Sequence, residues 1–280
     1  MNKLNFLFCI TIAGLLSNFS CYCQEQSRYK ATYQFDFLRD TLVMEYFRRE
    51  VYVLQIGDKI TKGFTTQSYY VDSLGKLASN LPSRQLFTAS VQESIEAMRR
   101  TGDVSHIRNN PFNVGGFSAN IYKDYKKKEI RVKDNISIHN FIYTDELKPQ
   151  DWDMLSETAT ILGYHCQKAQ CHYRGRDWEA WFTTEIPISE GPWKFYGLPG
   201  LVTKLYDSKN HYSFELIGFQ GIKESIDTKI PKGAQKIERK EFLRTMFGEK
   251  GDMIINADMS KIGIQSEPTK RNYDYIERDY

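Results

Sequence analysis

Alternation of apolar and polar residues dominates this chain, and this pattern is typical of β-strands. In the stretch YKATYQFDFL, Ala31, Tyr33, Phe35 and Phe37 fall on one face, and polar residues fall on the other. A strand of an antiparallel sheet with one buried face has this pattern. Further strands are expected at Val51–Ile56, Ser118–Tyr122, Glu129–Val132, Ser137–Tyr143 and Thr158–Tyr164.

Two segments have helical rather than strand periodicity. The first begins at Ser90, which forms a capping box with Glu93, and closes at Gly102. The second covers 242–248, where apolar residues share one helical stripe and Gly248 ends it. Both helices are expected to cover a sheet rather than to bind a partner. The predicted fold is mainly β and antiparallel, a strongly curved sheet or partly open barrel with one or two covering α-helices.

The central part of the chain is expected to contain two consecutive hairpins. In the first, Gly175-Arg176 serves as a two-residue turn. The register set by this turn pairs Tyr173 with Trp178, Cys171 with Ala180, Ala169 with Phe182, His172 with Glu179, Gln170 with Trp181 and Lys168 with Thr183. The second hairpin pairs the strand from Leu201 with the strand from Tyr212, and places Lys204 diagonal to Glu215 on its polar face.

A segment rich in glycine and proline joins the two hairpins. Proline and glycine do not suit a central strand, and Pro199-Gly200 suits the middle of a type II turn. The run Gly197-Leu198-Pro199-Gly200-Leu201 contains no nucleophile, acid, base or metal ligand. A phosphate-binding loop would open a helix, whereas a strand follows here. The run is therefore interpreted as a structural corner.

The same run matches the signature of the GLPGLI family, secreted bacterial proteins of unknown function. The resemblance extends back through Gly163-Tyr164, Cys166, Lys168-Ala169, Gly175-Arg176, Ala180-Trp181, Glu185-Ile186-Pro187 and Gly191-Pro192. It is dense over Gly163 to Leu205. Val202 stands where the family name has its last isoleucine, and the ending Tyr273 to Glu277 lacks the Asn-Pro pair of the family. The resemblance implies export and brings no established reaction.

Two cysteines with neighbouring histidines raise the question of a disulfide or a metal site. His165-Cys166 and Cys171-His172 form a symmetrical pattern, and both residue types bind soft metals. In one continuous strand the thiols would point to opposite faces roughly 16 Å apart, whereas a disulfide needs Cα atoms within about 7 Å. Bridging requires a bulge between them. Cysteines of exported proteins are usually bridged, so the exported context argues for a Cys166–Cys171 disulfide and the strand geometry against it. The disulfide is left open, and no metal site is predicted.

The candidate binding residues lie on the polar face of the first hairpin. Trp181 has Lys168 and Glu179 near it, and His172 is expected opposite Glu179. An exposed aromatic residue ringed by polar groups marks a binding surface, whereas a second covering layer would make Trp181 part of a core. No common hydrolase or Walker motif occurs, so no catalytic residue and no cofactor is predicted.

The N-terminus has the features of a secretory signal peptide. Lys3 precedes an apolar run too short to span a bilayer, and Cys21 and Cys23 stand where small residues are required. Cleavage is expected after Cys23, and the alternative is lipidation of Cys21. The expected organisation is a signal peptide over 1–23, a single β-rich domain over 24–267 and an extended tail over 268–280.

The composition argues against a dedicated nucleic-acid binder, because the net charge is only +3 with 26% charged residues. The main hypothesis is an exported, non-catalytic binding or accessory protein of the bacterial envelope, in the periplasm or at the cell surface. Its partner would be an envelope protein or a small ligand. The alternative is a hydrolase of unrecognised type that acts on peptide or glycan.

Overall fold

The computed structural model describes residues 25–38, 47–69, 117–136, 139–248 and 275–280, with a few positions within 93–101 and 253–260. Its strands are β1 Gln26–Leu38, β2 Phe47–Gly57, β3 Ile60–Thr65, β4 Asn120–Asp124, β5 Glu129–Ile136, β6 His139–Glu146, β7 Asp153–Ile161, β8 Tyr164–Tyr173, β9 Arg176–Thr183, β10 Leu201–Asp207, β11 Tyr212–Ser225 and β12 Gln235–Lys236. The expected signal peptide, the Ser90 end of the first helix and tail residues 268–274 lie outside the described residues.

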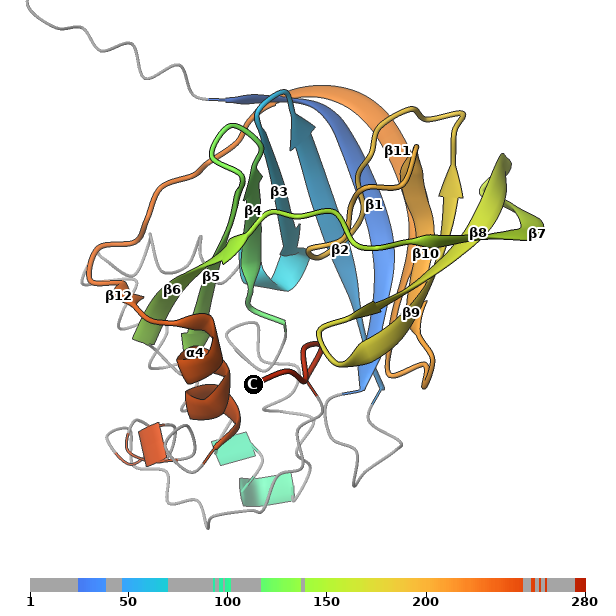
Figure 1. Cartoon of the computed structure of the whole chain (residues 1–280). Coiled ribbons are helices and arrows are strands. Elements are labelled where there is room, and N and C mark those ends of the chain that lie inside the picture. Colours follow the sequence, from blue (N-terminus) through green and yellow to red (C-terminus); the bar gives the residue numbers. More distant parts are fainter. Residues whose placement is uncertain are drawn as a thin grey trace, which may run out of the picture.

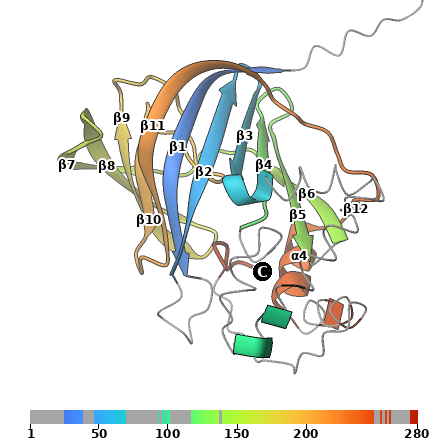
Figure 2. The same cartoon turned by 180° about the vertical axis from the view of Figure 1, so that it is seen from behind.

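The strands form one 12-stranded sheet in the order β12-β6-β5-β4-β3-β2-β1-β11-β10-β9-β8-β7. Neighbouring strands are antiparallel apart from the β12–β6 pair, which is parallel. The sheet curls around its core without closing, and the β7–β8 hairpin projects at one end (Figures 1 and 2). The predicted mainly β, strongly curved antiparallel fold is therefore confirmed.

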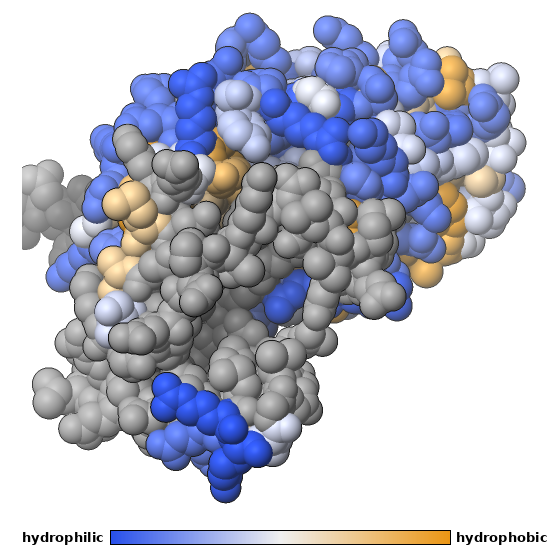
Figure 3. Space-filling view, turned by 90° about the horizontal axis from the view of Figure 1, so that it is seen from below, coloured by the Kyte–Doolittle hydropathy of each residue, from blue (hydrophilic) through white to orange (hydrophobic). Residues whose placement is uncertain are grey.

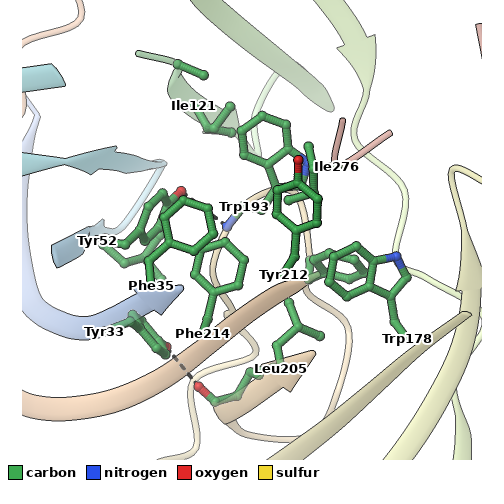
Figure 4. Close-up of a cluster of buried hydrophobic side chains, with 14 of the residues drawn as sticks. Tyr33, Phe35, Tyr52, Ile121, Trp178, Trp193, Leu205, Tyr212, Phe214 and Ile276 are labelled. Carbon is green, nitrogen blue, oxygen red and sulfur yellow. Dashed lines mark hydrogen bonds between the residues drawn. The ribbon is translucent and has the colours of Figure 1, made fainter. Parts of the chain in front are cut away.

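The core fills the concave side of the curled sheet. On β1, Tyr33 and Phe35 are fully buried, as the alternation of the sequence predicts. The Phe35 ring stacks on Phe214 of the neighbouring β11 with 4.2 Å between ring centroids. The Tyr33 hydroxyl donates a hydrogen bond of 2.8 Å to the carbonyl oxygen of Val202, which is drawn in Figure 4. Aromatic side chains from distant parts of the chain thus fill one interior.

Helix α4, Arg239–Phe247, covers one end of the sheet. Phe242 packs on β6, with 5.7 Å between its ring centroid and that of Phe141 and 5.4 Å to that of Tyr143. The helix ends before Gly248, as the sequence predicts. Of the first predicted helix, Glu93 and the other described positions up to Thr101 are helical.

The predicted register of the β8–β9 hairpin is wrong by two residues. The turn is Arg174-Gly175, with φ of 53° and 76°, and it pairs Tyr173 with Arg176. A type I′ turn needs positive φ at both central positions, so the glycine occupies the second of them. A two-residue shift leaves every side chain on its predicted face.

The single strand expected over Thr158–Tyr164 is interrupted by a turn at Leu162-Gly163, which separates β7 from β8.

The GLPGL run bends sharply between β9 and β10 and packs against backbone. A Cβ atom on Gly200 would lie 1.9 Å from the carbonyl oxygen of Thr183. Gly197 has a φ of +102°, and its Cβ would lie 2.6 Å from Pro149 Cβ. The two glycines therefore allow a close approach that no other residue would permit.

In the following hairpin, Lys204 lies directly opposite Glu215 rather than diagonally as predicted.

Candidate functional site

Four side chains gather on the outer, convex face of β8, β9 and β10. Lys168 lies directly opposite Trp181 in the ladder, with its ammonium 5.8 Å from a ring centroid of Trp181. The same ammonium lies 2.9 Å from Glu179 Oε2, which also accepts a hydrogen bond from the Tyr206 hydroxyl. These four residues, Lys168, Glu179, Trp181 and Tyr206, are called the outer patch below.

Strand alternation positions the outer patch. Ala180 and Phe182 point inward and are 0% and 1% exposed, so Trp181 between them points away from the core. The side chains of Lys168 and Glu179 keep 18% and 33% of their surface exposed. The four residues of the patch are therefore partly exposed to solvent on the face opposite the core.

Electrostatics keep the two charged groups of the outer patch ionised. Hydrogen bonds from Tyr206 and then Lys168 hold the pKa of Glu179 below its usual range. The hydrogen bond to Glu179 raises the pKa of Lys168. Burial and the Glu179 contact raise the pKa of Tyr206, so its hydroxyl stays protonated. The patch offers a carboxylate, an ammonium and a phenol as fixed polar partners for a ligand.

The structure brings together three of the four predicted binding residues. His172 lies opposite Asp177, and its Nδ1 is 2.7 Å from Asp177 Oδ1 on an exposed surface. The predicted His172–Glu179 pair is wrong, because the two-residue register shift places Glu179 opposite Gln170. Tyr206 was missed. The β9–β10 register pairs Tyr206 with Glu179, and only the alternation of Lys204 and Tyr206 hinted at it.

Cys166 and Cys171, for which the sequence left a disulfide open, are not bridged. Strand β8 runs without a bulge from Cys166 to Cys171, and both residues are buried free thiols. Cys166 Sγ lies 3.2 Å from Thr203 Oγ1. Burial raises the pKa of Cys171 to about 12, which makes it an unreactive thiol. No group of three or more His, Cys, Asp or Glu side chains in the described residues is placed to hold a metal ion.

A second charged cluster lies in the interior, around Glu190. The ammonium of Lys123 lies 2.7 Å from Glu190 Oε2 and donates to the carbonyl oxygens of Gly191 and Phe195 at 2.9 and 2.7 Å. Glu190 Oε1 accepts hydrogen bonds from the hydroxyls of Thr61 and Tyr125. The side chains of Lys123 and Glu190 are only 1% and 4% exposed. This cluster fixes the segment between β9 and β10 and presents no free group to a substrate.

The rest of the described surface is mainly hydrophilic. Large exposed apolar residues such as Met154, Leu162 and Ile217 stand at separate positions. Seen from below, hydrophobic residues occur at separate spots of the described surface (Figure 3). Among the described residues, no helix has the length and apolar character needed to cross a membrane.

A family described as "N-glycanase peptide, N-terminal domain" matches residues 68–225, a span that contains the whole outer patch. Two solved structures are similar. "Structure of PNGF-II in P21 space group" has a TM-score of 0.48 and 16% identity over 78% of this chain. "Structure of PNGF-II in C2 space group" has a TM-score of 0.46 and 19% identity over 76% of this chain. The chain spans 32% and 31% of the lengths of those two chains. No curated protein matches it.

Proposed function

From the premise that this chain belongs to the family of the N-glycanase peptide, N-terminal domain, we propose that it binds the glycan of a glycoprotein. The family name is that of an enzyme acting on N-linked glycans. It supports the glycan-directed reading that the sequence left as an alternative. The proposed role within that reading is recognition, and the proposed recognition surface is the outer patch.

The observation that carries this proposal is the composition of the outer patch. Trp181 and Tyr206 supply flat amphipathic rings beside the ionised Lys168–Glu179 pair. A sugar ring has an apolar C–H face that packs on an aromatic ring, and hydroxyls that need hydrogen-bond partners around it. Lys168 can donate and Glu179 can accept at neutral pH, so the patch offers both kinds of contact within a few ångströms.

The second candidate function is glycan hydrolysis, which the family name favours. Glycoside hydrolysis ordinarily uses two carboxyl groups, one of them protonated as the general acid. Glu179 has its pKa held low by Tyr206 and Lys168, which is the wrong direction for a general acid. The outer patch therefore fits binding better than cleavage. A catalytic partner or domain would supply the bond-breaking step.

A glycan-binding role fits a location outside the cytoplasm, where the protein would encounter glycoproteins. The expected signal peptide over 1–23 and the resemblance to the secreted GLPGLI family support export, and Gly163–Leu205 lies inside the matched span 68–225. We propose a single β-rich domain that begins at residue 24, in the periplasm or at the cell surface. The separate tail expected over 268–280 does not fit the burial of Tyr275, Ile276 and Glu277 in the same fold, so the domain extends beyond residue 267. Cys21 is the alternative point of lipid attachment.

The decisive experiment compares binding of a glycopeptide with binding of the same peptide without its glycan. Trp181→Ala should lower the affinity for the glycopeptide at least tenfold, about 1.4 kcal/mol, with unchanged circular dichroism. The matched control is Tyr29→Ala, because Tyr29 is a 37% exposed aromatic residue on β1, outside the outer patch. Equal glycopeptide binding by wild type and Trp181→Ala would place the site elsewhere.

Cleavage is measured on the same samples. Release of free glycan by the wild type, abolished in Glu179→Gln, would favour the hydrolase over the binding protein. Tyr206→Phe sharpens the result, because it removes one hydrogen bond to Glu179 and keeps the ring. Under the binding proposal it should weaken glycopeptide affinity less than Trp181→Ala does.

A further inference from the structure

The last described segment, 275–280, is buried in the fold over its first three residues, whereas Arg278 is exposed and Asp279 is partly exposed. Tyr275, Ile276 and Glu277 are 7%, 1% and 0% exposed, although the segment is neither helix nor strand. It runs between α4 and the β8–β9 turn, close to the position marked C in Figure 1. Its burial therefore depends on contacts with other parts of the chain.

The acidic side chains of this segment meet three cations. Glu277 lies 2.5 Å from the ammonium of Lys194 and 2.8 Å from the guanidinium of Arg239. Asp279 lies 2.9 Å from Arg174 and 2.8 Å from Arg239. A buried carboxylate is tolerated only when cations and hydrogen bonds compensate for its lost hydration. The three cations supply that compensation.

Asp145, at the end of β6, completes the charge balance. It lies 2.7 Å from Arg174 and 2.9 Å from Lys194. Although burial opposes it, hydrogen bonds from Arg239 and Arg174 hold the pKa of Asp279 below its ordinary value. Asp145, Glu277 and Asp279 therefore face three cations that come from a turn, a loop and a helix.

The main chain of the segment also forms hydrogen bonds with residues of the β8–β9 hairpin. The carbonyl oxygen of Tyr275 accepts a hydrogen bond of 2.6 Å from Arg176 Nη2, and the Arg278 N–H donates one of 2.8 Å to the Arg174 carbonyl. A Cβ atom on Gly175 would lie 3.0 Å from Arg278 Cβ. The three residues of Arg174-Gly175-Arg176 thus contact the segment by charge, by close approach and by backbone hydrogen bonding.

Aromatic packing fixes the other end of the segment. The Tyr275 ring lies 4.6 Å from that of Phe247 on α4 and 6.3 Å from that of Trp193, measured between centroids. Ile276 lies among the core side chains close to Trp193 and Tyr212 (Figure 4). Each residue from Tyr275 to Asp279 has a side-chain or main-chain contact of its own.

We propose that the β8–β9 turn, together with Lys194 and Arg239, forms a peptide-recognition site whose ligand is the chain's own segment Tyr275–Asp279. The peptide that this site recognises has an aromatic residue, Tyr275, then an aliphatic residue, Ile276, and then carboxylates at Glu277 and Asp279. The site draws on β6, the β8–β9 turn, the β9–β10 loop and α4, so it is complete only when these elements have assembled. The docked segment then holds α4 and the loop containing Trp193 together, because Tyr275 packs against both. This inference is independent of glycan binding.

The experiment cuts the covalent connection and asks whether the segment stays bound. A specific protease site is placed within 261–274 of the full chain, and the cut protein is passed through a size-exclusion column at about 0.15 M salt. The tested variant is Glu277→Gln with Asp279→Asn. The matched control is Glu146→Gln with Asp58→Asn, whose carboxylates are exposed by 64% and 55% and pair on the surface.

The wild-type and control segments are expected to co-elute with the body after cleavage, and the tested variant segment to separate from it. Loss of the segment is expected to shift the tryptophan fluorescence, because Trp193 packs against Tyr275. If the variant does not fold, synthetic peptides of residues 272–280, wild-type and with the two amides, are compared as competitors on the cut wild type. Release of the wild-type segment on cleavage, or equal retention or competition by both versions, would overturn the proposal.

Discussion

Two Lys–Glu pairs of nearly equal length occupy opposite faces of the same sheet. Lys123 and Glu190 are 2.7 Å apart in the interior with side chains 1% and 4% exposed. Lys168 and Glu179 are 2.9 Å apart on the outer patch with side chains 18% and 33% exposed. Burial lowers the pKa of Lys123, whereas the Glu179 contact raises that of Lys168.

The difference between these pairs lies in what surrounds them. The interior pair is saturated by backbone carbonyls and hydroxyls, so it can only hold structure in place. The outer pair lies beside Trp181 and keeps part of its surface open to a ligand. A shared residue type and a shared distance therefore do not give a shared role.

The largest expected effect comes from breaking the interior pair. Glu190→Ala leaves the ammonium of Lys123 buried without its counter-charge, which should cost about 3–5 kcal/mol of unfolding free energy. Urea denaturation measures it. A double variant, Lys123→Met with Glu190→Leu, should recover much of the loss because no buried charge remains. A loss below about 1 kcal/mol for the single variant would contradict the contrast.

Asp134 is a buried carboxyl held by neutral donors, Ser118 Oγ at 2.5 Å and the Asn135 N–H at 2.8 Å. Burial raises its pKa from 3.8 to about 6. The folded state therefore keeps a proton that the unfolded state has lost, and the associated stability falls as the pH rises from about 4 to above 6.

The Asp134→Asn variant tests this pH dependence. Between pH 4 and pH 7, wild type should lose about 2–3 kcal/mol relative to Asp134→Asn, as measured by urea denaturation at each pH. Identical pH profiles for the two proteins would show that Asp134 titrates normally.

Gly200→Val tests the sharp bend of the GLPGL run between β9 and β10. The new side chain would collide with the carbonyl of Thr183, so a loss of about 1–3 kcal/mol is expected. Gly218→Val is the control, because nothing lies within 4 Å of a Cβ atom there. Thermal denaturation compares the two. An equal melting temperature for both variants would remove the steric explanation.

The smallest effect is expected on the outer patch. Glu179→Gln should cost less than about 1 kcal/mol, because a partly exposed pair is screened by water. The pKa of Glu179 is depressed, so the pair contributes above the ordinary carboxyl range and its contribution disappears as the pH falls through the lower folded pKa. A double-mutant cycle with Lys168→Met measures the pair. A coupling free energy as large as that of the Lys123–Glu190 pair would contradict the proposed difference between the interior and outer pairs.

Strand alternation in the sequence was enough to predict the curved antiparallel sheet and the inward face of β1. It also placed Trp181, Lys168 and Glu179 on one face, because a register error of two residues preserves the face. It could not predict the cross-strand partner of His172, since that partner depends on which residue takes the first position of the turn. Tyr206 required the β9–β10 register, which no local pattern specifies.

The interior charges were beyond sequence reasoning for a different reason. Arg174 and Arg176 look like ordinary turn residues, yet they contact Asp279 and Tyr275 at the other end of the chain. Likewise, Lys123 and Glu190 are paired only through the folding of the segment between β9 and β10 across the core. Buried ion pairs between distant segments leave no periodic signal in the sequence.

The central place of β1 in the sheet has a consequence for the order in which the protein is made. One neighbour, β2, follows it directly, but the other, β11, is among the last strands to be synthesised. Ser27 and Glu224, which are hydrogen-bonded across this pair, are 197 residues apart. Until β11 emerges, one edge of β1 remains unsatisfied and prone to mispairing, and such non-local pairing is slow. A chaperone that shields this edge of β1 until β11 has been synthesised should therefore raise the yield of folded protein.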